Sequence, residues 1–160
     1  MSTIGRKLRT AARQPPFVLA WLLPVWLLLG GARALILTLS FRRLAPHLGR
    51  PLGANAWVPR LDPQQEQRAL LIARVVYIAA RHTPWISNCF PQAIAARVLL
   101  GLYSIPYALH FGLMRDPASA EMKAHAWVAA GKVRVTGGES FGQFTVVGCF
   151  VAPGLDPSRN

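Results

Sequence analysis

The sequence predicts one α+β domain, with helices in its first half and a small antiparallel sheet in its second half. Residues 62–81 carry an apolar stripe at helical spacing, and 93–102 are rich in Ala, Leu and Val. From 105 to 151, several short runs carry apolar residues at the alternate positions typical of strands, and turn residues separate these runs. A chain of 160 residues, 52% hydrophobic and 15% charged, is long enough for one core and too apolar for disorder. Helices followed by strands is the α+β order.

Residues 1–44 form a basic and apolar N-terminal segment that we expect to be helical. Arg6, Lys7, Arg9 and Arg13 precede an uncharged stretch, 17–32, and a second apolar run follows Arg33. No small-x-small site closes the first run, so a cleaved signal peptide is not expected. Pro24 and Gly30-Gly31 predict several short helices. The segment either spans a membrane, lies on its surface, or packs on the protein itself or a partner; we favour packing.

Residues 45–61 contain three prolines and two glycines, which predict a linker without regular structure. The main part of the domain, 62–152, follows, and 153–160 form a tail. Asp62 has the properties of a helix N-cap, because Pro63 takes the first helical position and Gln65 lies three residues after the cap. This helix is expected to run to about Arg81.

The next helix carries the candidate nucleophile. Residues 84–92 are typical of a loop entering a helix that ends near Gly101, and Ser87 or Asn88 is suited to cap it. Pro91 is tolerated in a first turn, where amides have no intrahelical partner. The pattern places Cys89 at the helix amino terminus, where the helix dipole favours a thiolate, the nucleophilic form.

Four strands are expected after this helix, at 105–114, 122–130, 133–136 and 144–151. His125 lies on the second strand, 36 positions after Cys89. Because side chains alternate along a strand, His125 and Trp127 share one face, and Ala124, Ala126 and Val128 share the other. A cysteine that opens a helix and a histidine on a following strand suggest a Cys-His hydrolase, although two such residues in an apolar chain more often only pack.

The sequence motifs around Cys89 and His125 favour a catalytic role. Cys89-Phe90-Pro91-Gln92-Ala93 and Ala124-His125-Ala126-Trp127-Val128 resemble the transglutaminase-like cysteine peptidases of lasso-peptide biosynthesis, in the stand-alone leader-peptidase form of the lasso B proteins. The similarity covers about residues 35–151. It implies a papain/transglutaminase-like fold, with Cys89 as the nucleophile and His125 as the base.

The resemblance also implies an aspartate about a dozen residues after the histidine. Gly137 and Gly138 stand there in this chain, and Glu139 follows. Glu139 is therefore the predicted third catalytic residue, with Gln143 or a backbone carbonyl as alternatives, since a neutral group suffices to orient the histidine in papain-like enzymes.

The function that the resemblance implies is removal of the leader from a ribosomally synthesised lasso precursor peptide. Its implied partners are the precursor, a small leader-recognition protein and an ATP-dependent lasso cyclase. Two alternatives remain open. A transglutaminase-like acyl transferase would use the same residues with an amine in place of water. A non-enzymatic basic adaptor on a membrane surface would use the apolar segment and survive the loss of Cys89.

The net charge indicates which partners the protein could bind, and the cysteine content indicates in which compartment it could act. Lys and Arg number 18 against 6 acidic residues, a net charge of +12, which predicts an acidic peptide, nucleic acid or anionic lipid as partner. No zinc-finger spacing or RNA-binding signature is present, so nucleic acid is not expected. A nucleophilic Cys89 must stay reduced, which favours the cytoplasm, with membrane association left open; Cys149 is predicted to pack in a strand. No metal site or cofactor is expected.

Overall fold

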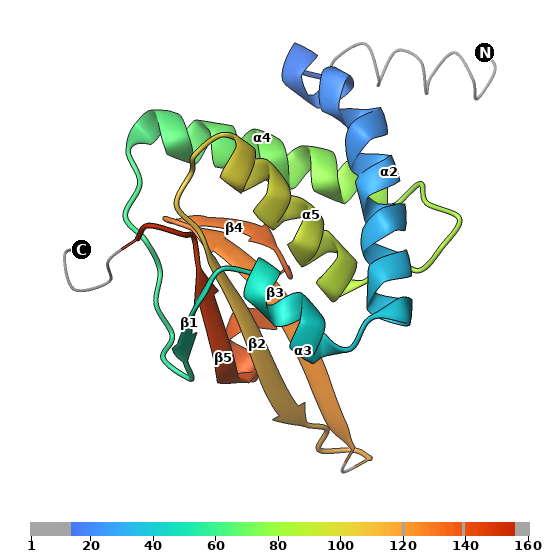
Figure 1. Cartoon of the computed structure of the whole chain (residues 1–160), viewed down its shortest axis with the longest axis vertical. Helices are drawn as coiled ribbons and strands as arrows, with labels where there is room; N and C mark the ends of the chain where they lie inside the picture. The colour runs from blue at the N-terminus through green and yellow to red at the C-terminus, as the bar shows by residue number, and fades with distance from the viewer. Residues whose placement is uncertain (1–13, 120, 139, 156–160) are drawn as a thin grey trace.

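Helices cover one face of a five-stranded antiparallel sheet whose strand order is β1-β5-β2-β3-β4 (Figure 1). The structure is a computed structural model that describes residues 14–119, 121–138 and 140–155. The described helices of three turns or more are α2 (Pro16–Thr38), α4 (Pro63–Ala80) and α5 (Cys89–Leu102). The α+β architecture and the helices-first order predicted from the sequence are confirmed.

The sheet is built around the hairpin of β2 (Ala108–Arg115) and β3 (Met122–Ala130). Their register runs from Ala108 opposite Ala129 to Arg115 opposite Met122. β5 (Thr145–Val151) pairs with the other edge of β2, and β4 (Val133–Thr136) pairs with β3. Leu109, Ala126 and Val128 belong to the core beneath the helices, so this face of β2 and β3 is the helix-covered one.

The segment 45–61, expected to be a linker without regular structure, contains a strand. β1 (Arg50–Gly53) pairs antiparallel with β5 and follows a short 3-10 turn, η1 (Ala45–His47). Gly49 precedes β1 at φ +133°, and a Cβ atom there would lie 2.2 Å from the carbonyl oxygen of Val151. Gly49, one of the residues that suggested a loop, therefore allows a close approach of the chain to the sheet edge.

The apolar N-terminal segment is one continuous helix up to Thr38, not the series of short helices expected from Pro24 and Gly30-Gly31. Pro24 cannot donate to the carbonyl of Ala20, but both residues lie on the exposed side of α2, where water can solvate that carbonyl. The opposite side of α2 is part of the core, through the buried residues Val18, Val25, Leu29 and Ala32.

Helix α4 begins as its sequence predicted. The Asp62 carboxylate accepts from the amides of Gln64 and Gln65, both at 2.8 Å, and the Gln65 side chain accepts from the Asp62 amide at 3.1 Å. This reciprocal capping box fixes the start of the helix. Ile72, Val75 and Val76 of α4 are fully buried, so one side of the helix is built into the core above the sheet.

Candidate active site

Cys89 is the first residue of α5, as the sequence predicted, and its side chain is half-buried with a free thiol. Asn88 takes the N-cap position without a side-chain capping bond. The preceding loop is instead held by Gln92, whose amide donates to the Ser87 carbonyl at 2.7 Å, and by Thr83, whose hydroxyl donates to Ser87 Oγ at 2.8 Å. The polar residues near the cysteine thus fix the loop, and Gln92 is a positioning residue that sequence reasoning did not identify.

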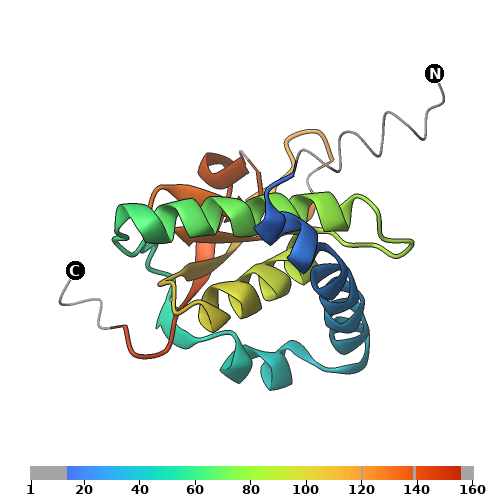
Figure 2. The same ribbon diagram turned by 90° about the horizontal axis from the view of Figure 1, so that it is seen from above.

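Helix α2 supports the same loop from outside. Figure 2 shows α2 crossing the end of the α4 and α5 layer beside residues 81–88. The Trp26 and Trp85 rings lie 4.5 Å apart, and Trp26 Nε1 donates to the His82 carbonyl at 3.1 Å. Gly30 leaves room for Trp85, because a Cβ atom at that position would lie 2.8 Å from the indole. Helix α2 therefore packs directly on the loop that leads into Cys89.

Four phenylalanines pack together next to Cys89. Phe90 and Phe111 have ring centroids 5.2 Å apart, and Phe41 lies 5.2 Å from Phe111 and 6.2 Å from Phe90. Phe150 completes the group, 5.9 Å from Phe111. These contacts, of which all but the tilted Phe41–Phe90 pair are edge-to-face, join α5, β2, β5 and the start of α3 (Phe41–Leu44) and fix the first turn of α5 over the sheet.

His125 lies on β3 and is half-buried in an aromatic environment. Its ring stacks against Trp127, with centroids 5.9 Å apart, and lies 5.0 Å from the Phe144 ring. Gly112 is opposite His125 in the β2–β3 register. A Cβ atom on Gly112 would lie 2.7 Å from both Trp127 and Phe144, so glycine creates the space that these rings fill.

The carbonyl of Gly137 is a hydrogen-bond partner of the imidazole, because His125 Nε2 lies 2.9 Å from that oxygen. A carbonyl can only accept, so Nε2 carries the proton and Nδ1 is the basic nitrogen of the neutral ring. Gly137 is twelve residues after His125, at the position where the resemblance implies an aspartate. Glu139, the predicted third residue, lies outside the described residues. Gln143, the other side chain considered, is exposed in η2 (Ser140–Gln143).

The elements that carry Cys89 and His125 pack against each other, because α5 lies over β3. The described contacts of the two side chains, however, are with other groups. Cys89 packs against the core on the helix-covered face. His125 contacts Trp127, Phe144 and the Gly137 carbonyl, and it alternates with Ala126, which faces the helices.

The second cysteine lies on the sheet face away from the helices. Cys149 is opposite His110 in the β2–β5 register, and both are almost fully buried. Burial raises the pKa of the Cys149 thiol to about 11, against a hydrogen bond to the Trp57 backbone that lowers it. Burial also lowers the pKa of His110, whose Nε2 lies 3.0 Å from the Trp57 carbonyl oxygen. The packing role predicted for Cys149 agrees with this neutral, enclosed environment.

The described residues include no group of three or more His, Cys, Asp or Glu side chains that converge as metal ligands.

Comparison with protein families gives one match. The family described as Transglutaminase-like superfamily matches residues 32–149, which run from the end of α2 into β5 and include both Cys89 and His125. No curated protein and no solved structure matches the chain significantly.

Proposed function

Because this chain belongs to the transglutaminase-like superfamily, whose members have cysteine peptidase or acyltransferase-type activity, we propose that it is a cysteine peptidase. The proposed reaction is removal of the leader from a ribosomally synthesised lasso precursor peptide. The superfamily supports the chemistry, and the two sequence words around Cys89 and His125 support the substrate.

One observation carries the catalytic part of the proposal. Cys89 opens α5, the helix that packs on the strand of His125, and the Gly137 carbonyl at 2.9 Å gives that histidine a defined tautomer. A helix amino terminus favours the thiolate, and an imidazole protonated on Nε2 presents Nδ1 as the base.

The mechanism follows from these roles. His125 Nδ1 takes the thiol proton, Cys89 Sγ bonds to the scissile carbonyl carbon, and the C–N bond breaks as the imidazolium returns the proton to the leaving amine. Water then attacks the thioester, its proton passes through the imidazole to the thiolate, and a carboxylate leaves. In the structure the thiol lies on the helix-covered face of the sheet and the His125 ring on the other face, so the reaction requires β3 or the start of α5 to shift when substrate binds.

Transglutaminase-like acyl transfer is the alternative within the same family. It differs only in the second step, where an amine replaces water and an amide forms. Mass spectrometry of the products in water containing a primary amine distinguishes the two reactions, because hydrolysis gives a free carboxylate and transfer gives an adduct with the mass of the amine.

The proposed partners are the precursor, a small leader-recognition protein and an ATP-dependent lasso cyclase. The net charge of +12 supports an acidic leader or adaptor among them. Both cysteines are free, which fits the reducing cytoplasm proposed as the location.

A contact with the membrane surface is proposed for α2. Leu23 and Leu27 are 66% and 58% exposed on its outer side. The helix is long and apolar enough to span a membrane, but its other side is built into the core, which supports lying on a surface instead. Arg42 and Arg43, both exposed, follow the helix and suit anionic headgroups.

Vesicle sedimentation tests this contact. The full-length protein should pellet with phosphatidylglycerol vesicles and much less with phosphatidylcholine vesicles. A Leu23→Gln/Leu27→Gln variant should stay in solution, whereas Leu70→Gln, at a residue of α4 that is 57% exposed, should pellet like the parent. Equal sedimentation of all three proteins would exclude α2 as the membrane contact. The non-enzymatic adaptor would require this binding together with full biological function of a Cys89→Ala variant.

The test of the peptidase proposal uses the two cysteines as a matched pair. Cys89→Ala should abolish cleavage of a cognate precursor, followed by mass spectrometry, while Cys149→Ala should retain it. Full turnover by Cys89→Ala would refute the proposal. Circular dichroism of both variants shows whether the fold is kept.

A further inference from the structure

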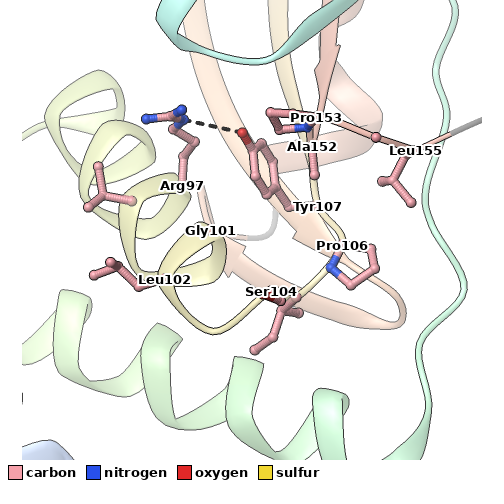
Figure 3. A pocket seen from close by; sticks show the side chains of 12 residues that line it. Arg97, Gly101, Leu102, Ser104, Pro106, Tyr107, Ala152, Pro153 and Leu155 are labelled. Carbon is pink, nitrogen blue, oxygen red and sulfur yellow. Dashed lines mark hydrogen bonds between the residues drawn. The ribbon is translucent and has the colours of Figure 1, made fainter.

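A hollow of about 640 Å³ lies at the carboxyl end of α5 (Figure 3). Its walls come from α5, from the turn before β2 and from the chain that follows β5, and most of them are apolar: Val98, Leu102, Ile105, Pro106, Ala152 and Leu155. Gly101 lines the hollow twelve residues after Cys89, a distance of about 18 Å along the helix. The hollow is therefore separate from the proposed catalytic site.

Among the described residues that line this hollow, Arg97 provides the one cationic side chain. It is half-buried, and its Nε donates to the Tyr107 hydroxyl at 3.2 Å. That hydroxyl in turn donates to the Leu48 carbonyl at 3.0 Å, and Tyr107 is fully buried. The guanidinium is thus held in place by a rigid partner, as Figure 3 shows.

The remaining donors of Arg97 have no acceptor in the part of the chain that the structure describes. Its bond to Tyr107 uses one of five N–H groups, and the ion pair among the described residues joins Lys123 and Asp116. A guanidinium stays charged at any physiological pH, and a half-buried charge is stabilised by an opposite charge. The two terminal NH₂ groups are suited to a planar anion that accepts two parallel hydrogen bonds.

The rim of the hollow carries a second polar group. Ser104 has φ +53°, a left-handed conformation that a helix end commonly gives to glycine. The amide of Ile105 donates back to the Leu100 carbonyl at 2.9 Å, which closes this helix end. A serine here adds a hydroxyl to the lining that glycine would lack.

We propose that this hollow is a binding site for an aliphatic carboxylate, with the carboxylate on Arg97 and the apolar body against the walls. A ligand with a larger polar body, such as a nucleotide, would leave its polar groups unpaired against these side chains. Two sources supply an aliphatic carboxylate: a peptide that ends in an apolar residue, and a fatty acid. The proposal does not depend on the peptidase function, because it involves neither Cys89 nor His125.

Isothermal titration calorimetry on the full-length protein tests the site with three probes: acetyl-leucyl-leucine, the same dipeptide as its C-terminal amide, and decanoate. We expect the free acid to bind and the amide to bind at least tenfold more weakly. Tighter binding of decanoate than of the dipeptide would identify a lipid source, and the reverse a peptide source. Binding of the amide as tight as that of the acid would overturn the proposal.

Two variants and a control locate the site. Arg97→Gln should weaken binding of the acid at least tenfold. Gly101→Leu should weaken it similarly while keeping the charge, because a Cβ atom at Gly101 meets nothing within 4 Å and the leucine fills open space. Arg74→Gln, at an exposed arginine of α4, should bind like the parent. If Arg97→Gln fails to fold, Gly101→Leu decides, and unchanged affinity in that variant would place the ligand elsewhere.

Discussion

Gly137 contacts the candidate histidine through its carbonyl and has a backbone conformation that favours glycine. Its carbonyl lies 2.9 Å from His125 Nε2, and its backbone has φ +95°, in the left-handed region that favours glycine. A Cβ atom on Gly137 would lie 2.3 Å from the Trp127 Cβ and 3.2 Å from His125 Nε2. The tight backbone leaves no space for a side chain, so a carbonyl occupies the place beside the imidazole.

This packing predicts that Gly137→Asp will not restore an acid beside the histidine. Strain in the backbone and the clash with Trp127 should destabilise the protein by roughly 1–3 kcal/mol or more and displace the His125 ring. Thermal unfolding measures the stability, and the histidine signals in an NMR spectrum report the ring. Gly138→Ala is the control, since Gly138 also has positive φ (+64°) but no neighbour within 4 Å of its Cβ position. A Gly137→Asp protein no less stable than Gly138→Ala would contradict this account.

The two cysteines should differ in alkylation. Burial raises the pKa of Cys149 to about 11, so at pH 8 only about one thiol in a thousand is ionised, and the group is also almost inaccessible. We expect iodoacetamide to modify Cys89 at pH 8 and to leave Cys149 unmodified until the pH approaches 11 or the protein unfolds. Peptide mapping after timed labelling measures both rates. Equal labelling of the two thiols in folded protein would show that Cys149 is not enclosed.

At the scale of the helices and strands, α2 has two sides with different roles. Leu29 is fully buried and Leu27, two residues earlier, is 58% exposed. Leu29→Ala should therefore lower the free energy of unfolding by about 2–5 kcal/mol, because it leaves a cavity between α2 and the core. Leu27→Ala should change it by no more than about 0.5 kcal/mol. Urea denaturation of both variants measures the difference, and similar values for the two would mean that α2 is not part of the folded domain.

The elements that the sequence predicted well are those with strong local signals. Asp62, Pro63 and Gln65 defined the start of α4, because capping chemistry acts within a few residues. The start of α5 was also predicted correctly, although Asn88 takes the N-cap position without the expected side-chain bond. β1 was missed because a strand at residues 50–53 depends on pairing with β5, about a hundred residues later, and not on its own composition.

The same distinction holds for the candidate site. Cys89 and His125 could be identified as candidate site residues from the short sequence motifs around them. The alternation of His125 with Ala126 could also be predicted from the strand pattern. The partner of His125 could only be named as one of three alternatives, since a backbone carbonyl has no sequence signature. Gln92, Trp85 and Phe41 were missed because their contacts join distant parts of the chain, although Gln92 lies within the cysteine word itself.

For the whole molecule, the charge excess predicts how association depends on salt. With 18 basic and 6 acidic residues, the protein should bind a polyglutamate peptide, and affinity should fall steeply as salt rises. Exposed charges are screened beyond about 8 Å at physiological ionic strength, which explains the direction. Fluorescence anisotropy at several salt concentrations measures it, with a polyglutamine peptide as the control. Binding that is equally tight at high salt would point to apolar contacts instead.

The hydrogen bond between His125 and the Gly137 carbonyl involves the backbone, so side-chain substitutions do not remove its acceptor. An alanine scan removes side chains, so it leaves this carbonyl in place at every position and cannot report on the contact. Replacing the peptide link between residues 137 and 138 by an ester weakens the carbonyl as an acceptor while leaving all side chains unchanged. A protein with this ester, made by semisynthesis, therefore tests the contact between the Gly137 carbonyl and His125 directly.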